Sequence, residues 1–136
     1  MSKKIWNKRR KKKRLTDKVK HEILRFVKRG RVKKLIEAME IYDSFVNLTF
    51  ADDGGGGTVV PLLGSGTLLH FASFYGNEKV AIVLIHNGAD VNAVAGEEEW
   101  TPLHCAVHNG HVDTLKILLQ NGADVNAARG SIDWTA

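Results

Sequence analysis

The sequence predicts an all-α solenoid, in which helix pairs joined by short hairpin loops stack in a row. Three observations predict this fold. The C-terminal half repeats itself at a fixed period, each repeat holds two short apolar segments, and glycines follow those segments. A unit of this size cannot bury its apolar face alone, so successive units have to stack to form a core.

The repeat is found by comparing the chain with itself at the shift that places residue 87 on residue 121. The run NGADVNA occurs at 87–93 and again at 121–127. Five more positions match in the same register, namely Thr67, Leu69, His70, Ala72 and Gly76 against Thr101, Leu103, His104, Ala106 and Gly110. These matches predict repeats over residues 66–99 and 100–133, and the start of a truncated one at 134–136.

Each repeat carries the start and stop signals of a helix pair. Thr67 and Thr101 are suited to cap a first helix, because a threonine oxygen can accept a free amide hydrogen of the first turn. Gly76 and Gly110 permit the tight turn that follows. The segments VAIVLI and VDTLKILL then place apolar residues at helical spacing and predict the second helices.

The residues at 100–106 (WTPLHCA), followed by Gly110-His111 and by NGADVN at 121–126, resemble a near-consensus ankyrin repeat. The resemblance covers about residues 66–136, half of the chain. The earlier repeat departs from the family pattern at Leu68, where the family has proline. The period is one residue longer than the usual 33 or so, and we place the extra residue in the loop AVAGEEE. The resemblance also implies that the histidine of each TPLH-type motif forms hydrogen bonds within and between repeats.

The resemblance implies a non-catalytic adaptor that binds another protein through its first helices and hairpin tips. Mapped onto this chain, these positions are Phe71, Phe74, Tyr75, Glu97, Glu98, Glu99, Trp100, Cys105, His108 and Asn109. Aromatic residues are favoured at interface hot spots, and consecutive glutamates favour a basic partner. Two of these positions have a structural alternative. Phe71 can fill the core between repeats, and the recurrence of Trp100 at Trp134 favours packing.

Residues 16–47 lack the TPLH-type motif but keep the pattern of a helix pair, with two apolar segments separated by a glycine. Thr16 can cap a helix with apolar residues on one face, Gly30 ends it, and a second apolar segment follows. Val46-Asn47 then repeats the Val-Asn that closes both later repeats. We interpret this segment as a degenerate N-terminal capping repeat with a polar outer face.

A glycine-rich insertion over residues 48–65 separates this capping repeat from the clear ones. Its four consecutive glycines, 54–57, predict a flexible segment, since glycine is costly to hold in one conformation. A phosphate-binding loop is disfavoured, because the Lys-Ser/Thr pair expected after the glycines is missing.

Charge is distributed unevenly along the chain. Residues 1–34 hold 17 of the 20 Lys and Arg residues and two acids, whereas residues 35–136 hold 13 acids and three bases. This predicts a disordered basic tail over residues 1–15. Its densest part is Lys8, Arg9, Arg10, Lys11, Lys12, Lys13 and Arg14. Four interpretations stay open: an import signal read by an importin-type receptor, contact with nucleic acid, attraction to an anionic membrane, and an inert solvated tail.

No cofactor or metal site is expected. His104 and His111 belong to the repeat motif, and the chain has no second pair of ligands at zinc-finger spacing. Cys105 and His108 can share a helix face, but a nucleophile also needs an orienting third group, so we predict no enzymatic activity.

Two further expectations concern the C-terminal end of the stack and the cellular compartment. A stack that stops within a repeat should expose Leu115, Leu118 and Leu119, which allows end-to-end self-association. A single cysteine and no long apolar run predict an intracellular protein, cytoplasmic or nuclear, without a transmembrane segment.

Overall fold

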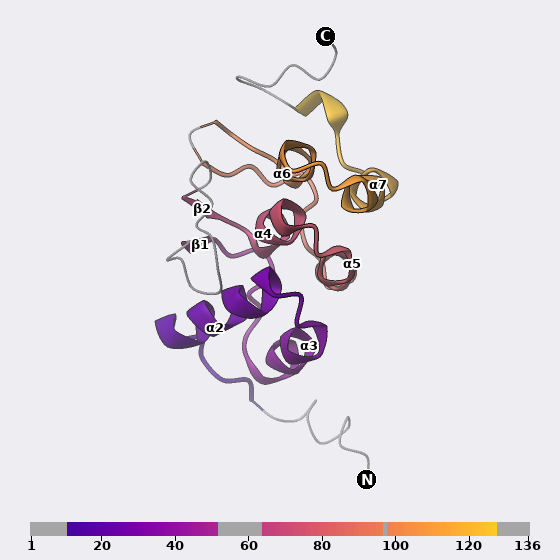
Figure 1. Cartoon of the computed structure of the whole chain (residues 1–136). Coiled ribbons are helices and arrows are strands. Elements are labelled where there is room, and N and C mark those ends of the chain that lie inside the picture. Colours follow the sequence, from indigo (N-terminus) through magenta and orange to yellow (C-terminus); the bar gives the residue numbers. More distant parts are fainter. Residues whose placement is uncertain (1–10, 52–63, 97, 128–136) are drawn as a thin grey trace.

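The computed structural model describes residues 11–51, 64–96 and 98–127. Within them, three helix pairs stack in a row, with the first helices in one layer and the second helices in another (Figure 1). The pairs are α2 (Asp17–Lys28) with α3 (Val32–Ile41), α4 (Leu68–Tyr75) with α5 (Glu78–His86), and α6 (Pro102–His108) with α7 (Val112–Gln120). A short 3-10 helix, η1 (Val125–Ala127), follows α7. The predicted all-α solenoid is confirmed.

The first helices begin at the predicted threonine caps. Thr16 Oγ1 accepts a hydrogen bond from the amide in the first turn of α2 at 3.3 Å. In the next two pairs the third helical residue closes the cap from the other side. The Nδ1 atom of His70 accepts from the Thr67 amide at 3.2 Å, and His104 does the same for Thr101 at 2.9 Å. A histidine thus takes the place that glutamate or glutamine holds in the usual capping box.

Asparagine side chains fasten each helix pair to the next. Asn47 donates to the carbonyl of Gly88 at 2.9 Å and accepts from the amide of Asp90 at 2.8 Å. Asn92 makes the same two contacts one repeat further on, at 3.2 and 2.8 Å. Asn47 therefore does for the first pair what Asn92 does for the second, although the first pair lacks the rest of the motif.

A second set of side-chain hydrogen bonds joins each turn between two helices to the preceding helix pair. Asn77 donates to the carbonyls of Val27 and Lys28 at 2.6 and 3.0 Å, which satisfies the C-terminal end of α2. His111, one period after Asn77, donates through Nε2 to the carbonyl of Phe74 at 2.9 Å and so satisfies the end of α4. These bonds fix how the successive first helices lie against each other.

We expect Gly76→Ala to lower the free energy of unfolding by about 2 kcal/mol. About half of this comes from holding alanine at a φ of +70° and about half from the lost bond of His111, whose ring would collide with the new Cβ. Urea denaturation measures the loss. Gly110→Ala is the matched control, since its φ is +67° and a Cβ there meets nothing within 4 Å. Equal losses in both variants would show that His111 contributes nothing.

The N-terminal segment 11–15 is ordered, so the prediction of a disordered tail is wrong for these residues. We call this segment the strap. Lys13 pairs with α3 and the residues after it: its amide donates to the Ile41 carbonyl at 2.9 Å, and its carbonyl accepts from the Asp43 amide at 3.0 Å. The Lys12 ammonium donates to the carbonyl of Met39 at 3.2 Å. Residues 1–10, the rest of the predicted tail, lie outside the described residues.

The two ends of the glycine-rich insertion form a small sheet. Strand β1 (Phe50–Ala51) pairs antiparallel with β2 (Ser65–Gly66), and Phe50 is buried. The insertion therefore begins and ends in ordered structure, whereas its glycines 54–57 lie outside the described residues.

The expected exposure of three leucines in α7 is correct for one of them. Leu119 is 43% exposed, but Leu118 is fully buried and Leu115 packs partly buried against the core. Residues 128–136, which include the predicted start of a further repeat, lie outside the described residues.

Candidate protein-binding face

Aromatic side chains at the ends of α4 and α6, and in the hairpin that precedes α6, lie side by side. Phe74 contacts Tyr75 edge to face, with ring centroids 5.4 Å apart, and stacks on His108 at 6.0 Å. His108 in turn meets Trp100 edge to face at 5.2 Å. We call Tyr75, Phe74, His108 and Trp100 the aromatic row. Lys28 of α2 adds a cation at one end, with Nζ 5.9 Å from the Tyr75 ring centroid.

The members of the aromatic row differ in their access to solvent. Phe74 and Tyr75 are half-buried, and His108 is exposed. Trp100 is only 4% exposed and stacks on His104 at 5.8 Å, so its predicted role in partner contact is wrong. It supports the row from beneath instead, which agrees with the packing alternative. A partner therefore meets three rings, not four.

Phe71 and Cys105 do not reach the surface, and their prediction as contact residues is also wrong. Both are fully buried. They stand one period apart and so occupy the same, covered position of the repeat. Burial raises the pKa of the Cys105 thiol, which keeps it protonated. This is the opposite of what a cysteine nucleophile requires.

Asn109 is exposed, but its amide already has a partner. Its Nδ2 atom donates to the carbonyl of Phe74 at 2.7 Å, the same carbonyl that accepts from His111. Two side chains of the third helix pair thus hold the end of α4, where Phe74 and Tyr75 stand. Asn109 supports the aromatic row through the backbone beneath it.

The predicted acidic tip is a tight hairpin beside the aromatic row. The amides and carbonyls of Ala95 and Trp100 exchange two hydrogen bonds, at 2.8 and 2.9 Å, and so close the loop. Glu98 and Glu99 are exposed, and Glu99 has a φ of 54°, a left-handed conformation that is uncommon outside glycine. Glu97 lies outside the described residues.

A buried histidine joins this hairpin to α4. His70 accepts from the Thr67 amide through Nδ1, so its proton is on Nε2, which donates to the carbonyl of Trp100 at 2.8 Å. Burial lowers the pKa of His70 to about 4, and it also lowers the pKa of His104. Both rings are therefore neutral at pH 7. The role that the resemblance gave to these histidines, bonding within and between repeats, is seen for His70.

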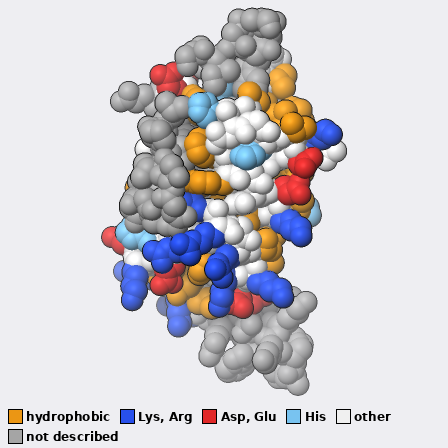
Figure 2. All heavy atoms as spheres, viewed as in Figure 1, with side chains coloured by type: hydrophobic (Ala, Val, Ile, Leu, Met, Phe, Trp, Pro, Cys, Tyr) orange, Lys and Arg blue, Asp and Glu red, His pale blue; other side chains and the backbone are white. Residues whose placement is uncertain are grey.

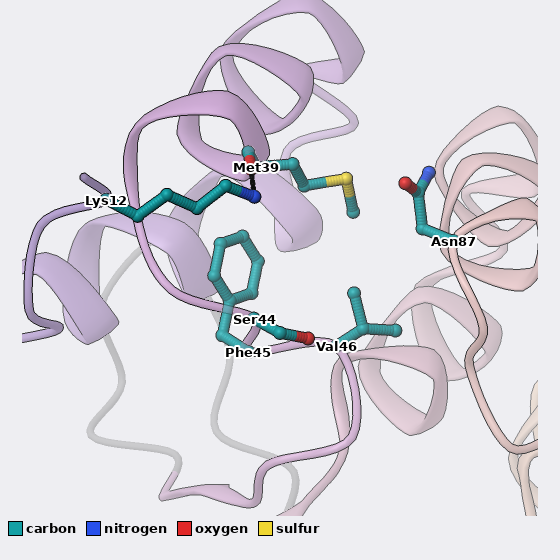
Figure 3. A pocket seen from close by; sticks show the side chains of 6 residues that line it. All are labelled: Lys12, Met39, Ser44, Phe45, Val46 and Asn87. Carbon is teal, nitrogen blue, oxygen red and sulfur yellow. Dashed lines mark hydrogen bonds between the residues drawn. The ribbon is translucent and has the colours of Figure 1, made fainter. Parts of the chain in front are cut away.

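One hollow among the described residues lies beneath the strap and has little room for a small molecule. Figure 3 shows Lys12 reaching to the Met39 carbonyl on one side of it, with Asn87 on the opposite side. Its volume of about 90 Å³ is well below the roughly 300 Å³ at which ligand pockets begin. Among the described residues, no three His, Cys, Asp or Glu side chains gather as metal ligands.

The stacked helix pairs, and the hydrogen bonds that recur between them at equivalent positions, define a helical repeat protein. The sequence model described as ankyrin repeats (3 copies) matches residues 27–129, most of the chain. The chain belongs to the ankyrin-repeat family, whose repeats generally mediate protein–protein interaction and are typically not catalytic. A search of curated proteins finds no match to this chain. No helix in the described part of the chain has the length and apolar character needed to cross a membrane.

Proposed function

We propose that this chain is a non-catalytic adaptor that binds another protein through Phe74, Tyr75 and His108, the accessible part of the aromatic row. The observation that carries the proposal is the juxtaposition of these three rings across two helix pairs. Aromatic side chains are enriched among the residues that dominate interface energies. Because fixed helix ends hold these rings, little conformational freedom is lost when a partner binds.

The charges around the aromatic row favour a particular kind of partner. The exposed Glu98 and Glu99 belong to the hairpin of Trp100 at one end of the row, whereas Lys28, beside Tyr75 at the other end, is only 6% exposed. A segment with an apolar or aromatic anchor and a basic residue on the side of the glutamates would match this order of groups. Such rim charges mainly set orientation and association rate, whereas the rings supply most of the affinity.

Site-specific photo-crosslinking tests this proposal and identifies the partner. A photoreactive phenylalanine analogue is placed at His108, and at Ile36 as the control, since Ile36 is 41% exposed on α3, a second helix that contributes nothing to the row. We expect one protein to be trapped from position 108 and not from position 36. The same yield from both positions would contradict the proposed face. Circular dichroism checks that both variants fold.

Other partners stay predictions. Reading of residues 8–14 by an importin-type receptor, and with it a nuclear location, depends partly on Lys8, Arg9 and Arg10, which lie outside the described residues. End-to-end self-association depends on residues 128–136, which also lie outside them.

A further inference from the structure

The first helix pair carries a basic surface, whereas the acidic hairpin lies between the second and third pairs. Residues 11–51 contain 12 Lys and Arg residues against five acids, whereas the described residues from 64 onward contain two against six. Figure 2 shows Lys and Arg side chains gathered over α2 and α3, with few over the other helices on the same face. The described parts of the chain are therefore oppositely charged along the stack.

Helix α2 presents one side to the core and its cations to solvent. Ile23, Leu24 and Val27 are buried on the core side. Lys18, Arg25 and Arg29 are exposed, and spacings of seven and four residues place them along one side of the helical segment. The three cations thus form a line along the outside of the first pair.

The strap continues this line of charge. Its side chains Lys11, Lys13 and Arg14 are exposed, while its backbone is bonded to the end of α3 through Lys13. The strap runs directly into the first turn of α2, so its cations adjoin Lys18. Since the segment is already ordered, a ligand that binds these cations does not have to fix the backbone.

Within the described residues, these cations form no ion pair with neighbouring acids. Between two described residues the structure contains one ion pair, Lys34–Glu37 at 4.0 Å, and both of its side chains are exposed. The line formed by the strap, Lys18, Arg25 and Arg29 takes no part in it. The charge of this surface is thus available to an external anion.

The surface also lacks the apolar groups that other anionic partners use. The exposed large apolar residues of the first pair are on α3 and after it, at Ile36, Ile41 and Leu48, and none is on α2. Protein interfaces depend on buried aromatic or aliphatic anchors, and membrane-surface helices on an inserted apolar face. A phosphate backbone needs neither, because release of its counterions drives binding to Lys and Arg.

We infer that the strap and the exposed side of α2 bind the phosphate backbone of nucleic acid without reading its sequence. This site is separate from the aromatic row and does not depend on the proposed adaptor function. Each phosphate that a cation neutralises adds about 0.9 to the slope of log affinity against log salt concentration for duplex DNA. Contacts from Lys18, Arg25 and Arg29 therefore account for a slope of about 2.7.

Fluorescence anisotropy with the full chain and a labelled DNA duplex of mixed sequence tests the inference. The variant combines Lys18→Gln, Arg25→Gln and Arg29→Gln. We expect its affinity to fall about 100-fold near 0.1 M salt and its salt slope to fall by about 3. The control, Lys79→Gln with Lys116→Gln, removes cations of the later helix pairs and should change the affinity less than about threefold. Circular dichroism confirms folding of each variant.

Three results would overturn the inference. Unchanged binding by the α2 variant would do so, and so would loss of binding only on deletion of residues 1–10, which would assign it to the tail. Equal losses in the α2 variant and the control would indicate a response to net charge. Polyglutamate and phosphatidylserine vesicles serve as alternative probes. Tighter binding of either than of the duplex would assign the surface to an acidic protein or a membrane.

Discussion

Replacing Phe71 by alanine is expected to lower the free energy of unfolding by about 3–5 kcal/mol, the cost of removing a large buried ring and leaving a cavity. The side chain is fully buried in the hydrophobic core, so its loss removes core contacts. The midpoint of urea denaturation measures the effect. Because this loss can approach the whole stability of a small domain, Phe71→Leu serves as a milder variant, with an expected loss of about 1 kcal/mol.

Phe74→Ala is the matched control for Phe71→Ala. It removes the same atoms from the same helix, but Phe74 is half-buried at the surface. We expect a loss of about 1 kcal/mol, since only part of its area leaves water on folding. If the two variants lose equal stability, the division of α4 into a core position and a contact position is wrong.

Acidification is expected to destabilise the protein by about 2 kcal/mol at pH 5 and by about 3 kcal/mol at pH 4, relative to pH 7.5, through His70 alone. The pKa of His70 is about 4 in the folded chain, against an ordinary 6.5, because the ring is buried. Between these values the unfolded chain binds more protons, so stability falls as the pH falls from about 6.5 to 4. The lowered pKa of His104 acts in the same direction.

Urea midpoints measured at a series of pH values test this prediction. His70→Gln should lose most of the dependence between pH 7 and pH 4, because the variant has no imidazole to protonate at that position. His108→Gln, which removes an exposed ring, should retain it. A stability that stays level between pH 7 and pH 5 in the unmodified chain would contradict the assignment of a neutral, buried His70.

The stacked fold could be predicted because residues one period apart have the same structural role. Thr67 and Thr101 both cap first helices, with His70 and His104 closing each cap. A single sequence shift detects such equivalence without any structure. Asn47 could also be detected, because Val46-Asn47 matches the Val-Asn that ends each later repeat. Its hydrogen bonds to the next repeat need only this one asparagine at the end of a helix pair.

The candidate face was predictable only in part, because spacing does not reveal which side of a short helix is covered. Phe74 and Tyr75 are accessible, as expected, but Phe71, one turn earlier, is fully buried. Cys105 occupies the same covered position in the next repeat, so the pairing of two apolar residues one period apart was the available signal. Trp100 is covered because the hairpin folds its ring onto His104.

The strap could not be predicted from composition. A run of like charges predicts disorder because its side chains repel each other, but Lys13 is held through its backbone, which pairs with Ile41 and Asp43 regardless of the side chain. The lysine and arginine heads can remain in solvent while the chain is ordered beneath them. The distribution of charge along the sequence therefore predicted the basic surface, but it did not predict that the backbone of the strap is ordered.

The central claim is that the accessible rings of the aromatic row bind another protein. Its most direct test is a calorimetric titration of Phe74→Ala with the partner protein that the photo-crosslinking experiment identifies. Ile82→Ala is the control, since Ile82 is 36% exposed on the second helix α5. We predict an affinity about 30-fold weaker for Phe74→Ala, equivalent to about 2 kcal/mol, and no change for Ile82→Ala. Unchanged affinity of Phe74→Ala, or equal weakening of both variants, would contradict the claim.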